Sequence, residues 1–317
     1  PEGSLLDEAT DGGVRPIEVA AMCRAISPWR EWRCYRTLRE LIRRERPDVV
    51  HTHSSKAGIV GRAAAWAEQV PAVIHTIHGL PFHDRQPRFV HHTYVQLERW
   101  AARRCHKLVG ITQAMVDAFA QHRIGEARQF VVVPSGVEPG AFASAPSLRA
   151  AARRAYGIAD DAPVIGIVAR LDPLKGQHDL LDVLPRIRQR FAKVRLLLVG
   201  DGWIRDELER RVASKGLESS VIFAGLVPPG QVPSLLGAMD VMALPSYQEG
   251  QGRTLVEALL GGCAVVGYDA GGIAEVCIDG QTGRLVGVGD RQGLGDALLG
   301  MLEHPDERRR LADQGRR

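Results

Sequence analysis

The chain has 317 residues, which is enough for two domains with separate hydrophobic cores. Hydrophobic residues make up 45% and charged residues 25% of the sequence, as in ordinary soluble α/β proteins, and the net charge of +4 suits an anionic ligand or membrane surface without requiring either. No apolar run reaches the roughly 20 residues of a membrane-spanning helix. Five scattered cysteines, without a Cys-x-x-Cys pair, predict reduced thiols of a cytoplasmic protein rather than disulfides or metal ligands.

Residues 29–46 carry apolar side chains at helical spacing together with seven arginines and three glutamates. One interpretation is a solvated outer helix that packs through its apolar stripe. The other is a basic amphipathic helix that contacts an anionic membrane surface, which would make the protein peripheral at the inner face of the membrane.

Short apolar runs then alternate with helical patterns. We expect strands at 48–51, 72–77, 107–111 and 129–133, with helices at 58–67, 88–104 and 113–121. This alternation predicts βαβ units and a parallel sheet, in which ligands bind at the carboxyl ends of the strands. Four histidines lie near such ends: His51, His53, His78 and His83. His78, beside Gly79, is the best candidate for a functional residue, and no nearby carboxylate or cysteine completes a metal-ligand spacing.

Residues 139–147 are rich in Pro, Ser, Ala and Gly, which predicts a linker, and a short helix at 148–156 follows. We therefore divide the chain into domains 1–145 and 146–317. In the second domain the strand–helix pattern restarts. We expect strands at 163–168, 194–199, 221–223, 241–245, 264–266 and 283–286, helices at 177–190, 203–214 and 231–237, a helix from about 290, and a basic helical tail at 307–317.

The loop that follows the strand at 241–245 contains Glu249, Gly250 and Gly252, and Glu257 falls in the helix that it enters. Glycines allow backbone amides to approach a ligand closely, and a helix N-terminus attracts anions. Arg170 follows another strand of the same domain. Lys175 lies on the same loop, and the two cations suit the oxygens of a diphosphate. A phosphate site beside hydroxyl-binding carboxylates indicates a nucleotide sugar.

Three common motifs are absent, which weighs against other enzyme classes. There is no Gly-x-x-x-x-Gly-Lys-Ser/Thr of P-loop NTPases, no Gly-x-Gly-x-x-Gly of dehydrogenases in the first half, and no Gly-x-Ser-x-Gly of α/β-hydrolases.

Taken together, the motifs make the chain resemble the retaining GT-B glycosyltransferases of family 4. The resemblance covers nearly the whole chain, and its most specific element is the Glu249-x7-Glu257 spacing after Pro245-Ser246. The other matching segments are 47–53, 76–79, 134–138, 166–176, 199–202, 223–225 and 271–275. The family fold implies an α/β protein with two Rossmann-like parallel-sheet domains facing across a cleft. It also implies that a first strand precedes Pro1 and that a final crossover helix follows Arg317.

The resemblance assigns roles residue by residue. Arg170 and Lys175 should bind the donor diphosphate, Glu249 the donor sugar hydroxyls and Glu257 the ribose, while His78 should lie near the transferred sugar. The remaining substrate-binding residues implied by the family are Gly225, Leu226, Gly250, Gln251, Gly252, Arg253 and Thr254. Ser135 and Ala274 stand where the family usually has Asn and Pro.

By the same resemblance, the protein should transfer a hexose with retention of configuration from a UDP- or GDP-sugar to a glycan or polyprenyl-linked acceptor, in cell-surface polysaccharide or glycolipid synthesis. Neither a metal nor a cofactor is expected, because Arg170, Lys175 and helix-terminal amides supply the positive charge. A sugar-nucleotide epimerase of the same fold is the alternative enzyme, but it would need acid and base groups around the sugar. A nucleic-acid-binding or membrane-binding module is the non-enzymatic alternative, but aromatic residues make up only 5% of the chain, and no nucleic-acid partner is expected.

Overall fold

The computed structural model describes residues 4–23, 27–83 and 86–317. The chain divides into two compact units. Unit 1 consists of Pro1–Gly110 and Val116–Val132, and unit 2 of Ile111–Met115 and Val133–Arg317. No helix in the described residues is long and apolar enough to cross a membrane. Cys34, Cys105, Cys263 and Cys277 are free thiols, and all four are buried.

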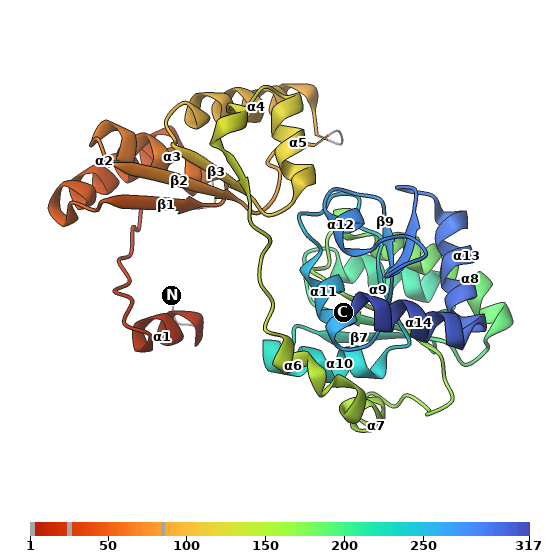
Figure 1. The fold of residues 1–317 in the computed structure, drawn as a ribbon. Helices are drawn as coiled ribbons and strands as arrows, with labels where there is room; N and C mark the ends of the chain where they lie inside the picture. Colours follow the sequence, from red (N-terminus) through yellow and green to blue (C-terminus); the bar gives the residue numbers. More distant parts are fainter. Residues whose placement is uncertain (1–3, 24–26, 84–85) are drawn as a thin grey trace. The chain divides into compact units, whose positions relative to one another are not determined.

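Unit 1 contains a parallel sheet in which the strands follow one another in sequence order, β1-β2-β3-β4. Right-handed crossovers between successive strands place the connecting helices on one face of the sheet, as Figure 1 shows for α3 and α4. The strands are β1 (Val49–His53), β2 (Ala72–Ile77), β3 (Lys107–Gly110) and β4 (Phe130–Val132). The helices are α1 (Ser4–Asp11), α2 (Pro28–Glu45), α3 (Ser55–Ala67), α4 (Arg88–Ala102), α5 (Gln113–Gln121) and η1 (Ala127–Gln129).

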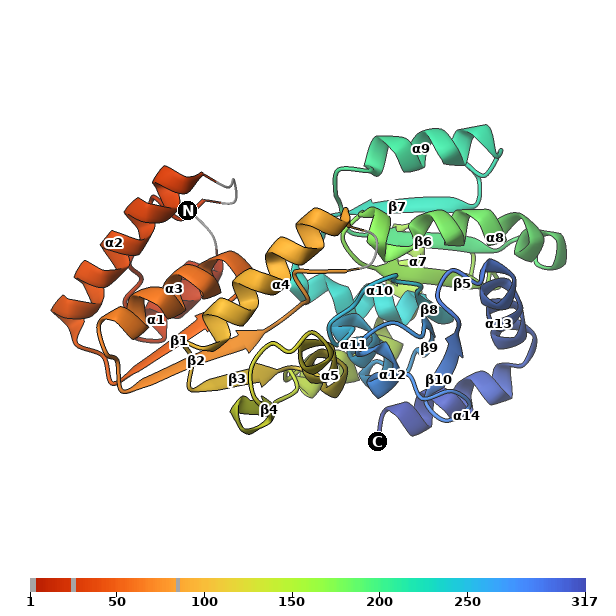
Figure 2. The same cartoon turned by 90° about the horizontal axis from the view of Figure 1, so that it is seen from above.

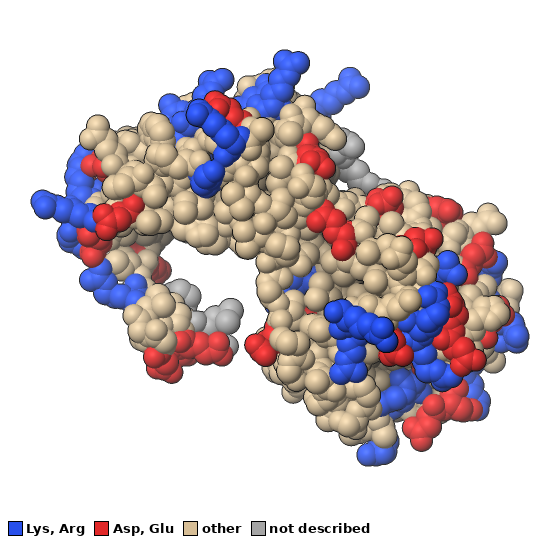
Figure 3. All heavy atoms as spheres, viewed as in Figure 1, with Lys and Arg blue, Asp and Glu red and all other residues tan. Residues whose placement is uncertain are grey.

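Helix α2 contacts α3, and its only fully buried side chain is that of Cys34. Four of its arginines pair with carboxylates: Arg43 donates to Glu68 at 2.7 Å and Arg39 pairs with the same carboxylate, while Arg36 pairs with Glu40 and Arg44 with Glu45. Figure 3 shows acidic side chains between the basic ones over α2, at the left of the view. Two tryptophans on this helix remain exposed, Trp29 at 64% and Trp32 at 46%.

Unit 2 contains a six-stranded parallel sheet with the order β10-β9-β8-β5-β6-β7. Figure 2 shows β5, β6 and β7 side by side. The strands are β5 (Val164–Val168), β6 (Arg195–Val199), β7 (Val221–Gly225), β8 (Val241–Leu244), β9 (Ala264–Tyr268) and β10 (Gly283–Val286). Because β5, β8 and β9 are almost wholly buried, they read as continuous apolar runs, as central parallel strands do.

Helices accompany each crossover of this sheet, and α8 packs against α9 and α13 while α7 packs against α10. The helices are α6 (Pro139–Ala143), α7 (Ala145–Ala155), η2 (Pro173–Lys175), α8 (Gln177–Arg190), α9 (Arg205–Ser214), η3 (Pro229–Gln231), α10 (Val232–Ala238), α11 (Arg253–Leu260), α12 (Ile273–Val276), α13 (Arg291–Glu303) and α14 (Pro305–Gly315).

The predicted linker at 139–147 is wrong, because these residues form α6 and the start of α7. Both helices contain proline in the first turn, where the missing N–H would have no helical partner and the fixed φ favours the helix. Phe142 and Ala145 are buried, and α6 packs against α11. The segment is therefore part of the core of unit 2.

Candidate functional site

The candidate site in unit 2 lies where the strand order reverses. From β5 the chain proceeds outward to β6 and β7, and then crosses back to β8 on the other side of β5. The loops that leave β5 and β8 in opposite directions open a crevice at their carboxyl ends, which is where parallel α/β sheets bind ligands. Residues 169–176 form the first loop and residues 245–252 the second.

An ion pair joins these two loops. The Nζ atom of Lys175 lies 2.6 Å from Oε2 of Glu249, and the side chains are 21% and 17% exposed. The hydroxyl of Ser246 donates to the same carboxylate oxygen at 3.2 Å. Because both charged groups are partly withdrawn from water, each is held in place by the other. The structure thus brings together two of the predicted site residues from segments 74 residues apart.

Arg170 has a different partner. Its Nη2 atom donates to Oδ2 of Asp172 at 2.7 Å, and its guanidinium lies 4.9 Å from the ring centroid of Trp203. Asp172 also caps the turn η2 by accepting from the backbone N–H of Leu174 at 2.9 Å. Since that turn ends at Lys175, Asp172 links both cations of the loop. Asp172 is not among the residues predicted from the sequence, although an Asp before Pro is a common signal for a capped turn.

Glycines allow the loops of this edge to touch through their backbones. A Cβ atom on Gly176, whose φ is +75°, would lie 2.0 Å from the carbonyl oxygen of Pro245. A Cβ atom on Gly271 would lie 2.2 Å from the carbonyl oxygen of Glu249, and one on Gly272 would lie 2.0 Å from that of Gly250. Gly271 and Gly272 are weak sequence signals by themselves, but they allow the loop after β9 to pack closely against the loop of Glu249.

The residues after Glu249 form the entry to α11. Gly252 adopts φ +71° at the N-cap, and Arg253 then lies 3.6 Å from Glu257 one turn on. Burial raises the pKa of Glu257, and the Arg253 guanidinium partly opposes this effect. Thr254 is in the first turn of the same helix. The predicted residues 250–254 and Glu257 therefore share one helix N-terminus, which favours an anion.

Gln251 has a structural role that the sequence did not indicate. Its Oε1 atom accepts from the backbone N–H of Ser135 at 2.8 Å, and its Nε2 atom donates to the carbonyl of Ser135 at 3.3 Å. Its side chain is thus occupied by the backbone of residue 135. Gly225 and Leu226 lie at the end of β7, farther along the sheet edge; Gly225 adopts φ +72° and Leu226 is 83% exposed.

A buried carboxylate on α8, which no sequence motif indicates, holds the second loop in place. Asp179, in the first turn of α8, is 1% exposed. Its Oδ2 atom accepts from the hydroxyls of Tyr247 at 2.6 Å and Tyr268 at 2.8 Å, and its Oδ1 atom accepts from Nε of Arg291 at 2.7 Å. Asp179 raises the pKa of Arg291, and burial followed by Asp179 raises the pKa of Tyr268. Tyr247 belongs to the loop of Glu249, so Asp179 ties this loop to the core.

In unit 1, three of the four histidines lie together at the carboxyl ends of β1 and β2. Nδ1 of His53 lies 2.9 Å from Nε2 of His78, and Nε2 of His51 lies 2.7 Å from the hydroxyl of Thr76. Burial and the neighbouring His53 lower the pKa of His78. Among the described residues, no group of three or more His, Cys, Asp or Glu side chains is arranged to hold a metal ion.

Comparisons with known proteins identify the family of the chain. Residues 149–317 match the family Glycosyl transferases group 1, and residues 2–140 match Glycosyltransferase Family 4. The UDP-Gal:alpha-D-GlcNAc-diphosphoundecaprenol alpha-1,3-galactosyltransferase of Escherichia coli is 29% identical over 81% of this chain and 67% of its own length. The 2-deoxystreptamine glucosyltransferase of Streptomyces kanamyceticus is 30% identical over 74% of this chain and 63% of its own.

The solved structure of Anabaena HepE in complex with UDP-glucose has a TM-score of 0.84 and 26% identity, and the match covers 100% of this chain and 84% of that one. Sucrose-phosphate synthase from Thermosynechococcus elongatus, at 23% identity and a TM-score of 0.83, shares the fold. The chain spans about half to two thirds of the length of curated relatives that it matches. Its two Rossmann-like parallel-sheet units have the GT-B fold, and the chain belongs to the glycosyltransferase family named Glycosyl transferases group 1.

Proposed function

We propose that the protein transfers a sugar from a UDP- or GDP-sugar to a glycan or lipid-linked acceptor. The observation that carries this proposal is the contact between Lys175 and Glu249 at the crevice between β5 and β8, with Arg170 on the same loop as Lys175. A cation next to a carboxylate suits a ligand with a diphosphate next to a sugar, because the cation can bind the diphosphate oxygens and the carboxylate can accept hydrogen bonds from the sugar hydroxyls. The solved HepE complexes with UDP, glucose and UDP-glucose support a donor of this class.

The ion pair suggests how the donor would bind. In the free protein, Lys175 and Glu249 neutralise each other. In the complex, the diphosphate oxygens accept hydrogen bonds from Lys175 and Arg170, and sugar hydroxyls donate to the carboxylate of Glu249. Each charged group thus exchanges one partner for another, so neither is left buried and unpaired.

The ribose, the phosphates and the base of the donor bind along the same carboxyl edge of the sheet. Glu257 accepts hydrogen bonds from the ribose, while the backbone amides of Gly250, Gly252 and Thr254 face the phosphates at the N-terminus of α11. Gln251 contributes through its backbone, because its side chain is held by Ser135. Arg253 shares this helix end, and the backbone at Gly225 and Leu226 faces the base.

We propose a retaining transfer. The bond between the anomeric carbon and the diphosphate oxygen breaks while the acceptor oxygen bonds to the same face of the sugar. The hydroxyl proton of the acceptor passes to the departing diphosphate. Positioning and stabilisation of the leaving charge by Arg170 and Lys175 supply the catalysis, so the reaction is proposed to proceed without a metal or cofactor.

The acceptor side is proposed to belong to unit 1. His78, held by its contact with His53, would lie near the transferred sugar. The name of the Escherichia coli relative specifies a diphosphoundecaprenol acceptor. We extend this acceptor class to the present chain, and with it a place in cell-surface polysaccharide or glycolipid synthesis. Contact with an anionic membrane surface through α2 would use its exposed Trp29 and Trp32.

Substitution of the paired residues tests the proposal. Glu249→Gln and Lys175→Ala should each reduce sugar transfer by about a hundredfold or more, because each leaves the other charge without its partner and removes one contact to the donor. Transfer is measured as release of UDP or GDP with radiolabelled donor, and circular dichroism checks the fold. The exposed Arg154→Glu on α7 is the control and should transfer normally. Near-normal transfer by both site variants would refute these assignments.

A further inference from the structure

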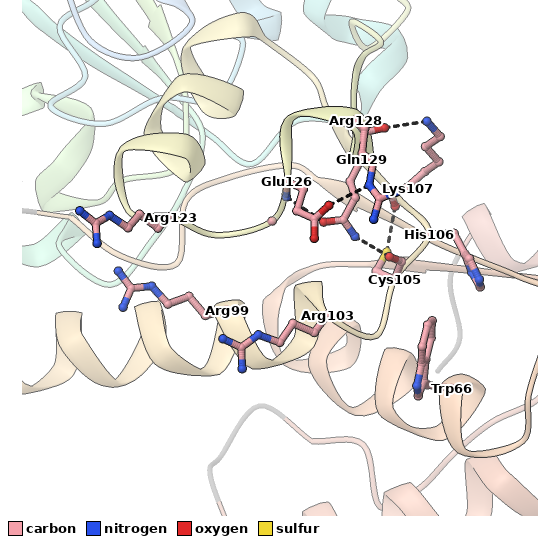
Figure 4. A pocket seen from close by; sticks show the side chains of 11 residues that line it. Trp66, Arg99, Arg103, Cys105, His106, Lys107, Arg123, Glu126, Arg128 and Gln129 are labelled. Carbon is pink, nitrogen blue, oxygen red and sulfur yellow. Dashed lines mark hydrogen bonds and ion pairs between the residues drawn. The ribbon is translucent and has the colours of Figure 1, made fainter.

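Unit 1 contains a basic pocket of about 540 Å³ that none of the roles above uses. Its wall is built from the end of α4, the starts of β3 and β4 and the turn after α5. Figure 4 shows the side chains of Arg99, Arg103 and Arg123 on one side of this pocket and those of Lys107 and Arg128 on the other. Trp66 from α3 also lines the pocket and lies at the lower right of Figure 4.

The charge of this pocket is strongly unbalanced. Four arginines and one lysine line it, against a single carboxylate, that of Glu126. Glu126 is already paired with Arg128 at 2.7 Å. Within the described parts of the chain, Arg99, Arg103, Lys107 and Arg123 form no ion pair. Arg99 donates to the carbonyl of His122 at 2.8 Å, and Lys107 donates to that of Arg128 at 2.9 Å, so the partners of both are neutral carbonyl groups.

The positive side chains of this pocket repel one another when no anion is bound. Arg99 in the last turn of α4 and Arg103 at its C-cap are four residues apart, and like charges at this spacing repel each other. The arginines of α2 differ, because Arg39 and Arg43 share the carboxylate of Glu68. A concave surface of one sign concentrates counter-ions of the other sign.

Within unit 1, the position of the pocket separates it from the proposed acceptor side. Residues 105–106 and 128–129 directly precede β3 and β4, and Lys107 is the first residue of β3, so the pocket lies at the amino-terminal edge of the sheet. His53 and His78 lie at the opposite, carboxyl edge of the same sheet. A ligand in the pocket would therefore not be the sugar that is transferred.

We propose that this pocket binds an anion that carries one or more phosphate groups. Guanidinium groups recognise phosphate through paired N–H donors, and three of them, from the end of α4 and the turn after α5, lie on one side of the pocket. Inorganic phosphate, a soluble organic phosphate and the head group of a phospholipid share this chemistry. Trp66 also lines a neighbouring apolar groove of about 490 Å³ with Trp32 and Trp100, which would receive the apolar part of a lipid.

The test compares charge reversal in the pocket with charge reversal elsewhere. Arg103 and Arg123 are exposed, so the Arg103→Glu, Arg123→Glu double variant should fold. The control is Arg154→Glu, Arg210→Glu, which changes the same number of exposed arginines in unit 2. All chains carry Lys175→Ala to weaken phosphate binding at the donor site.

Two arms identify the source of the phosphate. Calorimetric titration with pyrophosphate measures soluble anions, and sedimentation with phosphatidylcholine vesicles, with or without phosphatidylglycerol, measures lipid head groups. The pocket variant should lose at least about tenfold in affinity in one arm or both, as expected when charge-assisted hydrogen bonds are removed, while the control should bind like the parent.

The neutral variant Arg103→Gln, Arg123→Gln should show a smaller loss in the same arm. A loss confined to pyrophosphate would assign the pocket to soluble phosphates, and a loss confined to phosphatidylglycerol vesicles would assign it to lipid. Equal binding by the pocket variant and the control in both arms would overturn the proposal.

Discussion

Replacing Tyr247 by Phe should loosen the loop of Glu249 without unfolding unit 2. The hydroxyl of Tyr247 donates to Oδ2 of Asp179 at 2.6 Å, and that of Tyr268 donates to the same atom at 2.8 Å. The two tyrosines therefore form a matched pair. Tyr247 belongs to the loop of the candidate site, whereas Tyr268 is a fully buried residue of β9.

The two substitutions should have similar effects on stability. A hydrogen bond to a charged acceptor contributes about 1.5 to 3 kcal/mol. In either variant Asp179 keeps the other tyrosine and Arg291, so we expect a loss near the lower end, about 1.5 kcal/mol. For a unit of this size, such a loss lowers the melting temperature by roughly 3 to 6 °C. Urea unfolding of Tyr247→Phe and Tyr268→Phe measures the loss in free energy of unfolding, and thermal melts measure the shift in melting temperature.

Donor binding should separate the two variants. In Tyr247→Phe the donor must order a loop that the hydroxyl otherwise holds, and about 1.4 kcal/mol of ordering free energy weakens binding tenfold. In Tyr268→Phe the loop keeps its tether, so donor affinity should change little. Equilibrium titration with the donor measures both values. If both variants bind the donor equally well, the proposed role of Asp179 as an anchor of this loop is wrong.

Two further predictions concern the contact between the loops and the response to pH. Gly176→Ala should destabilise the fold far more than Gly216→Ala and should abolish donor binding. Both glycines have positive φ, a conformation that costs a residue with a side chain about 1 kcal/mol. Only at position 176 would the added Cβ atom also clash with the carbonyl oxygen of Pro245, at 2.0 Å. Urea unfolding and donor titration compare them, and equal losses would contradict the close contact. Burial lowers the pKa of His75 from 6.5 to about 3, so the folded state excludes a proton that the unfolded state binds, and stability falls as pH falls from the unfolded pKa towards the folded one. Below about pH 6, His75 should contribute a slope of about 1.4 kcal/mol per pH unit to the free energy of unfolding, and His75→Gln should remove this contribution. If urea unfolding gives the same slope for that variant as for the parent, His75 is not buried as a neutral imidazole.

Much of the secondary structure could be predicted from periodicity. The helices predicted at 113–121 and 177–190 are α5 and α8, with the same bounds. The linker predicted from the Pro-, Ser-, Ala- and Gly-rich composition of 139–147 is wrong, because proline can begin a helix as well as end one, and Pro139 and Pro146 occupy the first turns of α6 and α7. Composition alone does not distinguish these two uses of proline, since the distinction depends on whether the following residues pack.

The candidate site was only partly accessible from the sequence. The residue types and the loops that carry them could be predicted, because each loop follows an apolar strand. The contact between Lys175 and Glu249 could not, since it depends on β8 pairing with β5 after the chain has visited β6 and β7. Asp179 carried no motif of its own. Its function follows from being buried among Tyr247, Tyr268 and Arg291, which only the three-dimensional fold brings together.

Donor binding itself tests the central claim most directly. Melting temperatures are recorded with UDP-, GDP- and ADP-sugars for the parent chain, for Lys175→Ala and for the control Arg154→Glu. A ligand at a hundred times its dissociation constant stabilises the folded state by about 2.7 kcal/mol. We predict that a UDP- or GDP-sugar raises the melting temperature of the parent and the control by several degrees and leaves that of Lys175→Ala unchanged. If no donor stabilises the parent chain, or if Lys175→Ala is stabilised equally, the crevice between β5 and β8 is not the nucleotide-sugar site.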